Sequence, residues 1–185
     1  MATDSRLRIN PATNLPSITS FDELGQFLRS ASADEDTRLV SESMRDLSVH
    51  IEAIIASLRL NRLRTTVAPM LMDLLTVLRG QRNLVVHLGL PWRGLYEYAT
   101  YLQALNNFRV LIGQWLLEGG PRSTELRVTA EDFELVAWRT LGEGMLMVDM
   151  YEQWAASGQP EASTLGTLEE PQVERAIQWW KKLRR

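Results

Sequence analysis

The chain has 185 residues, of which 45% are apolar and 23% charged, so one domain can bury a substantial core. It contains no cysteine, which excludes disulfides, thiolate zinc sites and cysteine nucleophiles and fits a reducing, cytoplasmic compartment. The net charge is −3 with a pI near 5.5, which argues against non-specific coating of nucleic acid. No signal-peptide pattern and no apolar window of about 18 residues is present, so we expect no membrane contact.

The first predicted elements are an arm and a short helix. Residues 1–19 contain two prolines and no hydrophobic periodicity, so we expect an extended N-terminal arm. Ser20 and Glu23 have the spacing of a capping box, which predicts a helix that begins at about Phe21. Ser32 and Glu35 repeat this spacing and predict the start of a second helix.

The second helix carries the clearest periodicity of the chain. Its apolar residues recur every three or four positions, as Val40, Met44, Leu47, Ile51, Ile54 and Leu58. This spacing places them in one stripe along a helix, and such a stripe requires partner helices.

The next two predicted helices are delimited by proline and glycine. Pro69 suits the first turn of a third helix, which Gly80 interrupts. A fourth helix is predicted from about Pro91 to Leu117, with Leu95, Tyr98, Leu102, Leu105 and Phe108 facing inward.

The C-terminal third of the chain predicts a short extended piece and two further helices. The extended piece covers Glu125 to Val128, and Thr129 caps a fifth helix that ends at about Ala156. Within this helix, Gly142 and Gly144 introduce a kink or allow another helix to approach closely.

These elements predict an all-α fold, an antiparallel helical bundle of five or six helices, over residues 20–158. We expect a loop over residues 159–168 and a C-terminal helix over 169–185 that packs on the bundle or on a partner. Trp179 and Trp180 are adjacent and point about 100° apart on a helix, so one of them should cover a neighbour or a partner.

The candidate chemistry lies in the segment LRGQRNLVVHLGLPW, which begins at Leu78. Arg82, Asn83 and His87 in this order and spacing resemble the signature of the HEPN family, helical nucleotide-binding and ribonuclease domains of bacterial toxins and defence systems. The resemblance implies a metal-independent endoribonuclease, a toxin or antiviral defence effector, with these three residues catalytic. It also implies a homodimer, because the family is understood to line one cleft with two motifs. One branch of the family has a tyrosine where this chain has Gly89.

The residue types suit metal-free RNA cleavage. Histidine can take the 2′-hydroxyl proton, arginine can stabilise charge on the phosphorane, and Asn83 can orient the site by hydrogen bonding. We expect no cofactor and no metal, since the two histidines are far apart in sequence and no ligand cluster surrounds either. Arginines that could contact RNA are Arg59, Arg62, Arg64, Arg79 and Arg93.

Less specific interpretations remain open for these residues. His87 also suits a histidine hydrogen-bonded at the end of an apolar helix, and the arginines suit a solvated helix end. A looser match, Arg45 to His50, lies within the long amphipathic helix and suits a solvated face. The whole chain equally suits a non-catalytic helical subunit of a larger assembly, such as a small subunit of a ribonucleoprotein effector or a phage structural protein. The ribonuclease hypothesis requires Arg82 and His87 to be accessible and to face a cleft shared with a second copy.

Overall fold

Helices dominate the structure, a computed structural model that describes residues 7–31, 34–88, 95–120 and 122–156. The helices of this part of the chain are α1 (Phe21–Arg29), α2 (Glu35–Leu60), α3 (Arg64–His87), α5 (Tyr96–Leu117) and α6 (Ala130–Ala156). Two short strands, β1 (Ile9–Asn10) and β2 (Leu15–Pro16), precede them. The predicted all-α bundle is confirmed. The predicted loop 159–168 and C-terminal helix 169–185 lie outside the described residues.

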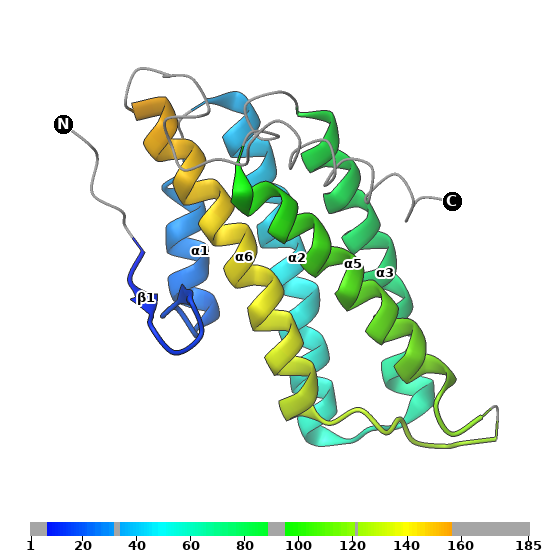
Figure 1. The fold of residues 1–185 in the computed structure, drawn as a ribbon. Coiled ribbons are helices and arrows are strands. Elements are labelled where there is room, and N and C mark those ends of the chain that lie inside the picture. Colours follow the sequence, from blue (N-terminus) through cyan, green and yellow to red (C-terminus); the bar gives the residue numbers. More distant parts are fainter. Residues whose placement is uncertain (1–6, 32–33, 89–94, 121, 157–185) are drawn as a thin grey trace.

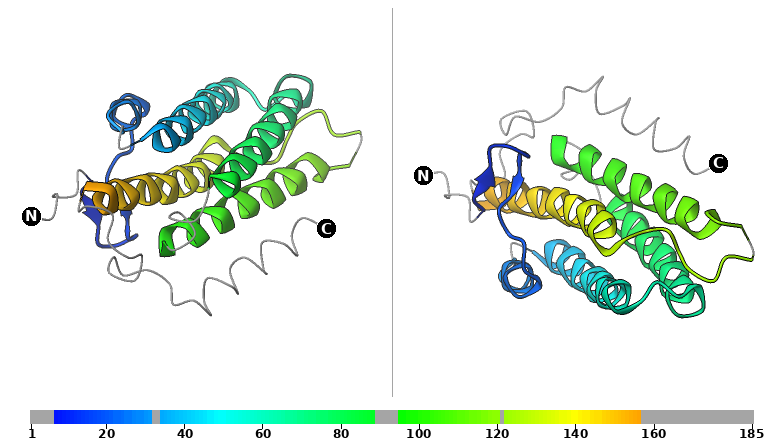
Figure 2. Two further views of the ribbon diagram at one scale, coloured as in Figure 1. Left: turned by 90° about the horizontal axis from the view of Figure 1, so that it is seen from above. Right: turned by 90° about the horizontal axis from the view of Figure 1, so that it is seen from below.

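The four long helices form an up-down-up-down bundle (Figure 1). α2 and α5 each pack against both α3 and α6, so the order around the bundle is α2, α3, α5, α6. The short helix α1 lies outside this ring, against α2 (Figure 2). Phe133 of α6 anchors an aromatic cluster, with ring centroids 5.5 Å from Phe108 and 5.9 Å from Trp115 of α5. Among the described helices, none combines the length and apolar character that crossing a membrane requires.

The stripe predicted for α2 is confirmed, because all six of its apolar residues are buried. The cap differs from the prediction: Asp34, rather than Ser32, precedes the helix, and its Oδ1 accepts from the Thr37 amide at 2.8 Å. The second carboxylate oxygen of Asp34 accepts from the Tyr151 hydroxyl of α6 at 2.5 Å. Hence Asp34 both caps α2 and links it to α6. Ser20 caps α1 as expected, accepting from the Glu23 amide at 3.2 Å.

Gly142 and Gly144 permit close packing on α6. At Gly144 the neighbours are helices, as one of the two sequence interpretations expected, whereas at Gly142 the neighbour is strand β2. A Cβ on Gly144 would lie 2.6 Å from Met44 Cε and 2.8 Å from Tyr101 Cε1, so no larger residue fits without movement. A Cβ on Gly142 would lie 3.3 Å from a Leu15 methyl, a tight but adjustable contact. Gly142 therefore allows β2 to pack on α6, and Gly144 allows α2 and α5 to approach α6.

The described part of the expected extended arm, residues 7–19, forms a small hairpin. β1 and β2 pair antiparallel, with Ile9 opposite Pro16 and Asn10 opposite Leu15. Asn14 in the turn has a φ of 56°, a left-handed conformation that asparagine tolerates better than most residues. The arm therefore turns back on itself and contacts α6 instead of extending into solvent.

Helix α3 differs most from its predicted bounds. It begins at Arg64, so Pro69 lies in its second turn and not in its first. The missing Pro69 amide leaves the carbonyl of Thr65 to solvent, which is acceptable because Thr65 is exposed. The helix also continues through Gly80 to His87. An exposed glycine destabilises a helix by about 1 kcal/mol relative to alanine. The burial of Leu78 and Val85 on either side of Gly80 stabilises the helix by more than this.

The connection from α5 to α6 crosses the end of the bundle. Leu63 and Glu125 form a single antiparallel bridge, and the Leu126 amide donates to the Arg62 carbonyl at 2.8 Å. The extended piece predicted near Glu125 is therefore present as one bridge. Thr129 caps α6 as expected, its Oγ1 accepting from the Asp132 amide at 3.1 Å.

Candidate functional site

The Arg/His motif lies on the last two turns of α3. The helix is unbroken there and ends at His87, where the Leu88 amide still donates to the Leu84 carbonyl at 3.2 Å. Five positions along a helix correspond to a turn of about 140°, so Arg82 and His87 point in different directions. The motif is therefore a helical segment with two faces and not a loop that converges on one point.

Arg82 belongs to the buried face of α3. Only 5% of its surface is exposed, and it follows Gln81, which is completely buried and donates to the Tyr101 hydroxyl at 3.0 Å. The sequence contained a signal for this placement. The buried stripe of α3 steps from Leu74 to Leu78 and on to Val85, and Arg82 fills the missing position between the last two.

His87 lies on the opposite, accessible side of the helix. It is exposed, Asn83 is half-buried, and Arg79 is exposed, so an accessible row steps by four positions from Arg79 to Asn83 to His87. In a single chain the structure thus groups His87 with Arg79 and Asn83, and it separates His87 from Arg82. A second chain could reach the row directly, but it could reach the Arg82 guanidinium only if the bundle opened.

The other arginines considered for RNA do not join this row. Arg64 hydrogen-bonds the carbonyls of Leu116 and Glu118 at 2.7 and 2.8 Å, which satisfies the last turn of α5. Arg59 forms an ion pair with Glu134 of α6. Both lie at the start of α3 or beside it, about 36 Å along this 24-residue helix from His87. Arg62 is half-buried in the same region, and Arg93 lies outside the described residues.

The second histidine lines a groove that sequence reasoning missed. His50 Nδ1 lies 2.9 Å from the Asp46 carbonyl oxygen, one turn earlier on α2. The groove has a volume of about 350 Å³ and runs between α2 and α3, with Val77 and Gly80 on its far side. The spacing of Asp46 and His50 was the available signal, but only the packing of α3 beside α2 creates the concavity.

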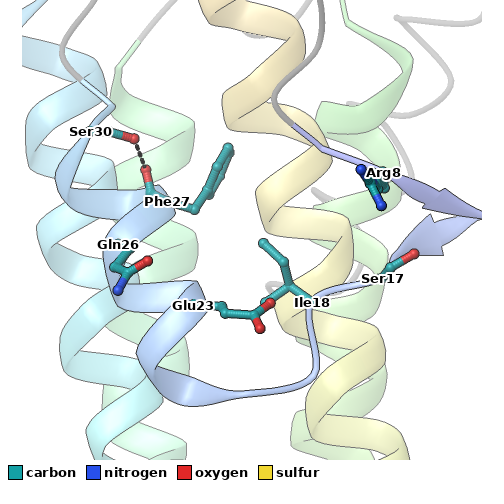
Figure 3. Close-up of a pocket in the computed structure, with 7 residues that line it drawn as sticks. All are labelled: Arg8, Ser17, Ile18, Glu23, Gln26, Phe27 and Ser30. Atoms are coloured by element: carbon teal, nitrogen blue, oxygen red, sulfur yellow. Dashed lines mark hydrogen bonds between the residues drawn. The ribbon is translucent and has the colours of Figure 1, made fainter.

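A larger hollow of about 540 Å³ lies between the N-terminal hairpin and α1 (Figure 3). Ile18 lies between Arg8 on one side and Glu23 on the other, with the Phe27 ring beyond them (Figure 3). Arg8, Glu23 and the lining serines are all exposed. Solvated groups of this kind can bind a small polar molecule. They do not, however, include a nucleophilic side chain next to a general base.

Two half-buried carboxylates form another feature absent from the sequence interpretation. Burial raises the pKa of Glu97 on α5 and of Glu143 on α6 above the ordinary glutamate value. The neighbouring Glu97 charge raises the pKa of Glu143 further, while Arg139 acts in the opposite direction. No group of three or more histidine, aspartate or glutamate side chains placed to hold a metal ion occurs among the described residues.

Comparison with known proteins adds no functional assignment. No protein family, curated protein or solved structure matches this chain.

Proposed function

We propose that this chain is a non-catalytic helical subunit that assembles with further copies of itself through one end of its bundle. The observation that carries the proposal is a group of exposed leucines, hereafter the leucine end. Its members are Leu60, Leu63, Leu117 and Leu135, which are 85%, 43%, 81% and 75% exposed. Large apolar side chains that gather at one place on a surface mark interaction sites more often than scattered ones do.

Contacts between the helices bring these leucines to the same end. Leu60 ends α2 next to Arg59, which pairs with Glu134, the residue before Leu135 on α6. Leu63 pairs with Glu125 in the connection that follows α5. Arg64, the next residue, binds the carbonyls on either side of Leu117 in sequence. Each leucine is thus at most one residue from a contact that ties two elements together. The ribbon shows that α2 and α5 end, and α3 and α6 begin, at this end of the bundle (Figure 1).

The charges around the leucine end favour a second copy as the partner. Exposed residues of both signs are interleaved there, with Arg122 and Arg127 close in sequence to Glu118 and Glu125. A nucleic acid would favour an excess of positive charge. A mixed surface can instead pair with itself, because a two-fold axis places the basic groups of one copy beside the acidic groups of the other.

Sedimentation equilibrium of the full chain tests the proposal. We expect the parent to self-associate, and we expect Leu117→Lys or Leu135→Glu to weaken association at least tenfold, because each inserts a charge into an apolar contact. Each new charge suits the dipole of its own helix, so folding should be preserved. The control is Val49→Glu, an exposed valine in the middle of α2. A parent that stays monomeric at its highest soluble concentration would refute the proposal.

A second candidate function is the metal-independent ribonuclease that the HEPN resemblance implies. The accessible row of Arg79, Asn83 and His87 favours it, because one exposed helix face offers a titratable ring and a cation. In this version Arg79 contacts the phosphate and His87 transfers the proton, while Arg82 supports the helix. Purified protein on mixed RNA in EDTA tests it. If the parent cleaves RNA and both His87→Ala and Arg79→Ala do not, the protein is a ribonuclease. If the parent leaves the RNA intact, the ribonuclease hypothesis is refuted and the non-catalytic subunit is the remaining function.

A further inference from the structure

The outer face of α5 differs from every other exposed helix face in the described part of the chain. It consists of Tyr96, Gln103, Asn107, Val110, Gln114 and Leu117, which are all exposed and are spaced as one side of a helix. None of them is charged. The two charged residues of this 22-residue helix, Glu97 and Arg109, are half-buried and lie to the side of this face.

The exposed faces of two other long helices, α2 and α6, have the composition expected for solvent contact. On α2 the exposed positions include Glu35, Arg38, Glu42, Asp46, Glu52 and Arg59, and on α6 they include Glu131, Asp132 and Arg139. The exposed face of a surface helix normally carries charged as well as polar residues. Tyr96 and Val110 are nevertheless 55% and 50% exposed. Depletion of charge together with an aromatic residue and amides is typical of a protein interface.

One segment of the same chain has the complementary pattern. In residues 171–185 the apolar side chains recur at helical spacing, as Val173, Ala176, Ile177, Trp180 and Leu183. Glu174, Lys181 and Lys182 fall outside this stripe, whereas Arg184, the next-to-last residue, falls within it. The stripe needs apolar contacts, which Tyr96 and Val110 supply, and a face without charge can be covered without leaving a buried ion unpaired.

The connection to α6 allows the segment to reach this face. α6 ends at Ala156, at the same end of the bundle where α5 begins (Figure 1). Residues 157–170 provide 14 residues, which span up to about 46–50 Å when extended, whereas α5 is about 33 Å long. A tether of this length gives a local concentration in the millimolar range, well above that of a separate molecule.

We propose that residues 171–185 dock as a helix on the outer face of α5, with Val173, Ile177 and Trp180 against Val110 and its neighbours. The charged side of the segment then replaces the uncharged face of α5 at the surface. The outer face of α5 meets the leucine end at Leu117, but docking on the face around Val110 does not depend on self-association.

Disulfide trapping in the full chain tests the proposal, since the chain has no cysteine of its own. Val110→Cys is combined in turn with Val173→Cys, Ile177→Cys or Trp180→Cys, and each protein is oxidised gently. We expect at least one combination to close a bond within a single chain, because cysteines bond when their Cα atoms come within about 7 Å. The matched control is Val49→Cys on α2, 63% exposed, with the same three partners. Bonds formed only between chains, equal bonding at Val49, or no bond at all would each overturn the proposal.

Hydrogen exchange provides a second measurement without cysteines. In the parent, amides of residues 171–185 should exchange at least about tenfold more slowly than an unstructured peptide of the same sequence. Val110→Arg should abolish this protection, and Val49→Arg should preserve it. Exchange at the unstructured rate in the parent, or protection that Val110→Arg does not alter, contradicts docking on α5.

Discussion

The contrast between Arg82 and Arg79 leads to the most informative prediction about the motif. The two arginines are one turn apart on α3, but Arg82 is 5% exposed whereas Arg79 is exposed. Arg82→Ala removes two buried methylenes, worth about 0.8 kcal/mol each, and leaves a cavity inside the bundle that adds to this loss. Relief of the cation's burial offsets part of this loss. We therefore expect Arg82→Ala to destabilise the fold by about 2–4 kcal/mol and Arg79→Ala by no more than about 0.5 kcal/mol.

Chemical and thermal denaturation followed by circular dichroism measures both effects. For a chain of this length, the expected loss at Arg82 lowers Tm by about 5–15 °C. The Arg79→Ala protein serves as the matched control, because it removes the same side chain from the same helix. If Arg82→Ala unfolds at the parent's midpoint, then Arg82 does not lie inside the bundle. In that case Arg82 would be accessible, and the ribonuclease hypothesis with Arg82 at the phosphate would again be possible.

Three further predictions concern packing and pH, each measured by denaturation. Gly144→Ala should destabilise by about 1–3 kcal/mol through overpacking, whereas Gly142→Ala should be close to neutral; equal effects would contradict the close approach at Gly144. Partial burial alone would raise the pKa of Asp34, but hydrogen bonds from Tyr151 and Thr37 outweigh it and lower the pKa from 3.8. Asp34→Asn should therefore destabilise the fold at pH 7, and this loss should shrink as the pH falls below 3.8. Burial raises the pKa of Glu97 from 4.5, so Glu97→Gln should stabilise at pH 7, and the gain should vanish below pH 4.5; a gain that persists in acid would exclude this cause.

The leucine end and the outer face of α5 are tested by different substitutions. Self-association through the first should respond to Leu135 on α6, and docking on the second should respond to Val110 on α5, whereas Leu117 lies where the two surfaces meet. The shared control at Val49 lies on α2, which packs against α1, α3 and α6. The two proposals can therefore fail independently.

Local sequence patterns were sufficient for the helices and most of their caps. The stripe of α2 from Val40 to Leu58, the caps at Ser20 and Thr129 and the end of α6 at Ala156 follow from residues within a few turns of one another. Such signals are local, because helical hydrogen bonds and side-chain neighbours lie three or four residues apart. The same reasoning anticipated a close approach at Gly144, but it could not name Met44 and Tyr101 as the neighbours.

Features that depend on distant segments were decided only by the tertiary structure. α3 continues through Gly80 because the burial of apolar residues on both sides outweighs the local cost of the glycine. The arm folds back because Leu15 and Pro16 pack on α6 at Gly142, which has no side chain. The motif shows the limit most clearly. Its spacing placed Arg82 and His87 on different sides of a helix, but spacing does not say which side faces the core. That choice is made by the rotation of α3 against its neighbours, since burying Leu74, Leu78 and Val85 turns Arg82 inward and leaves His87 in solvent.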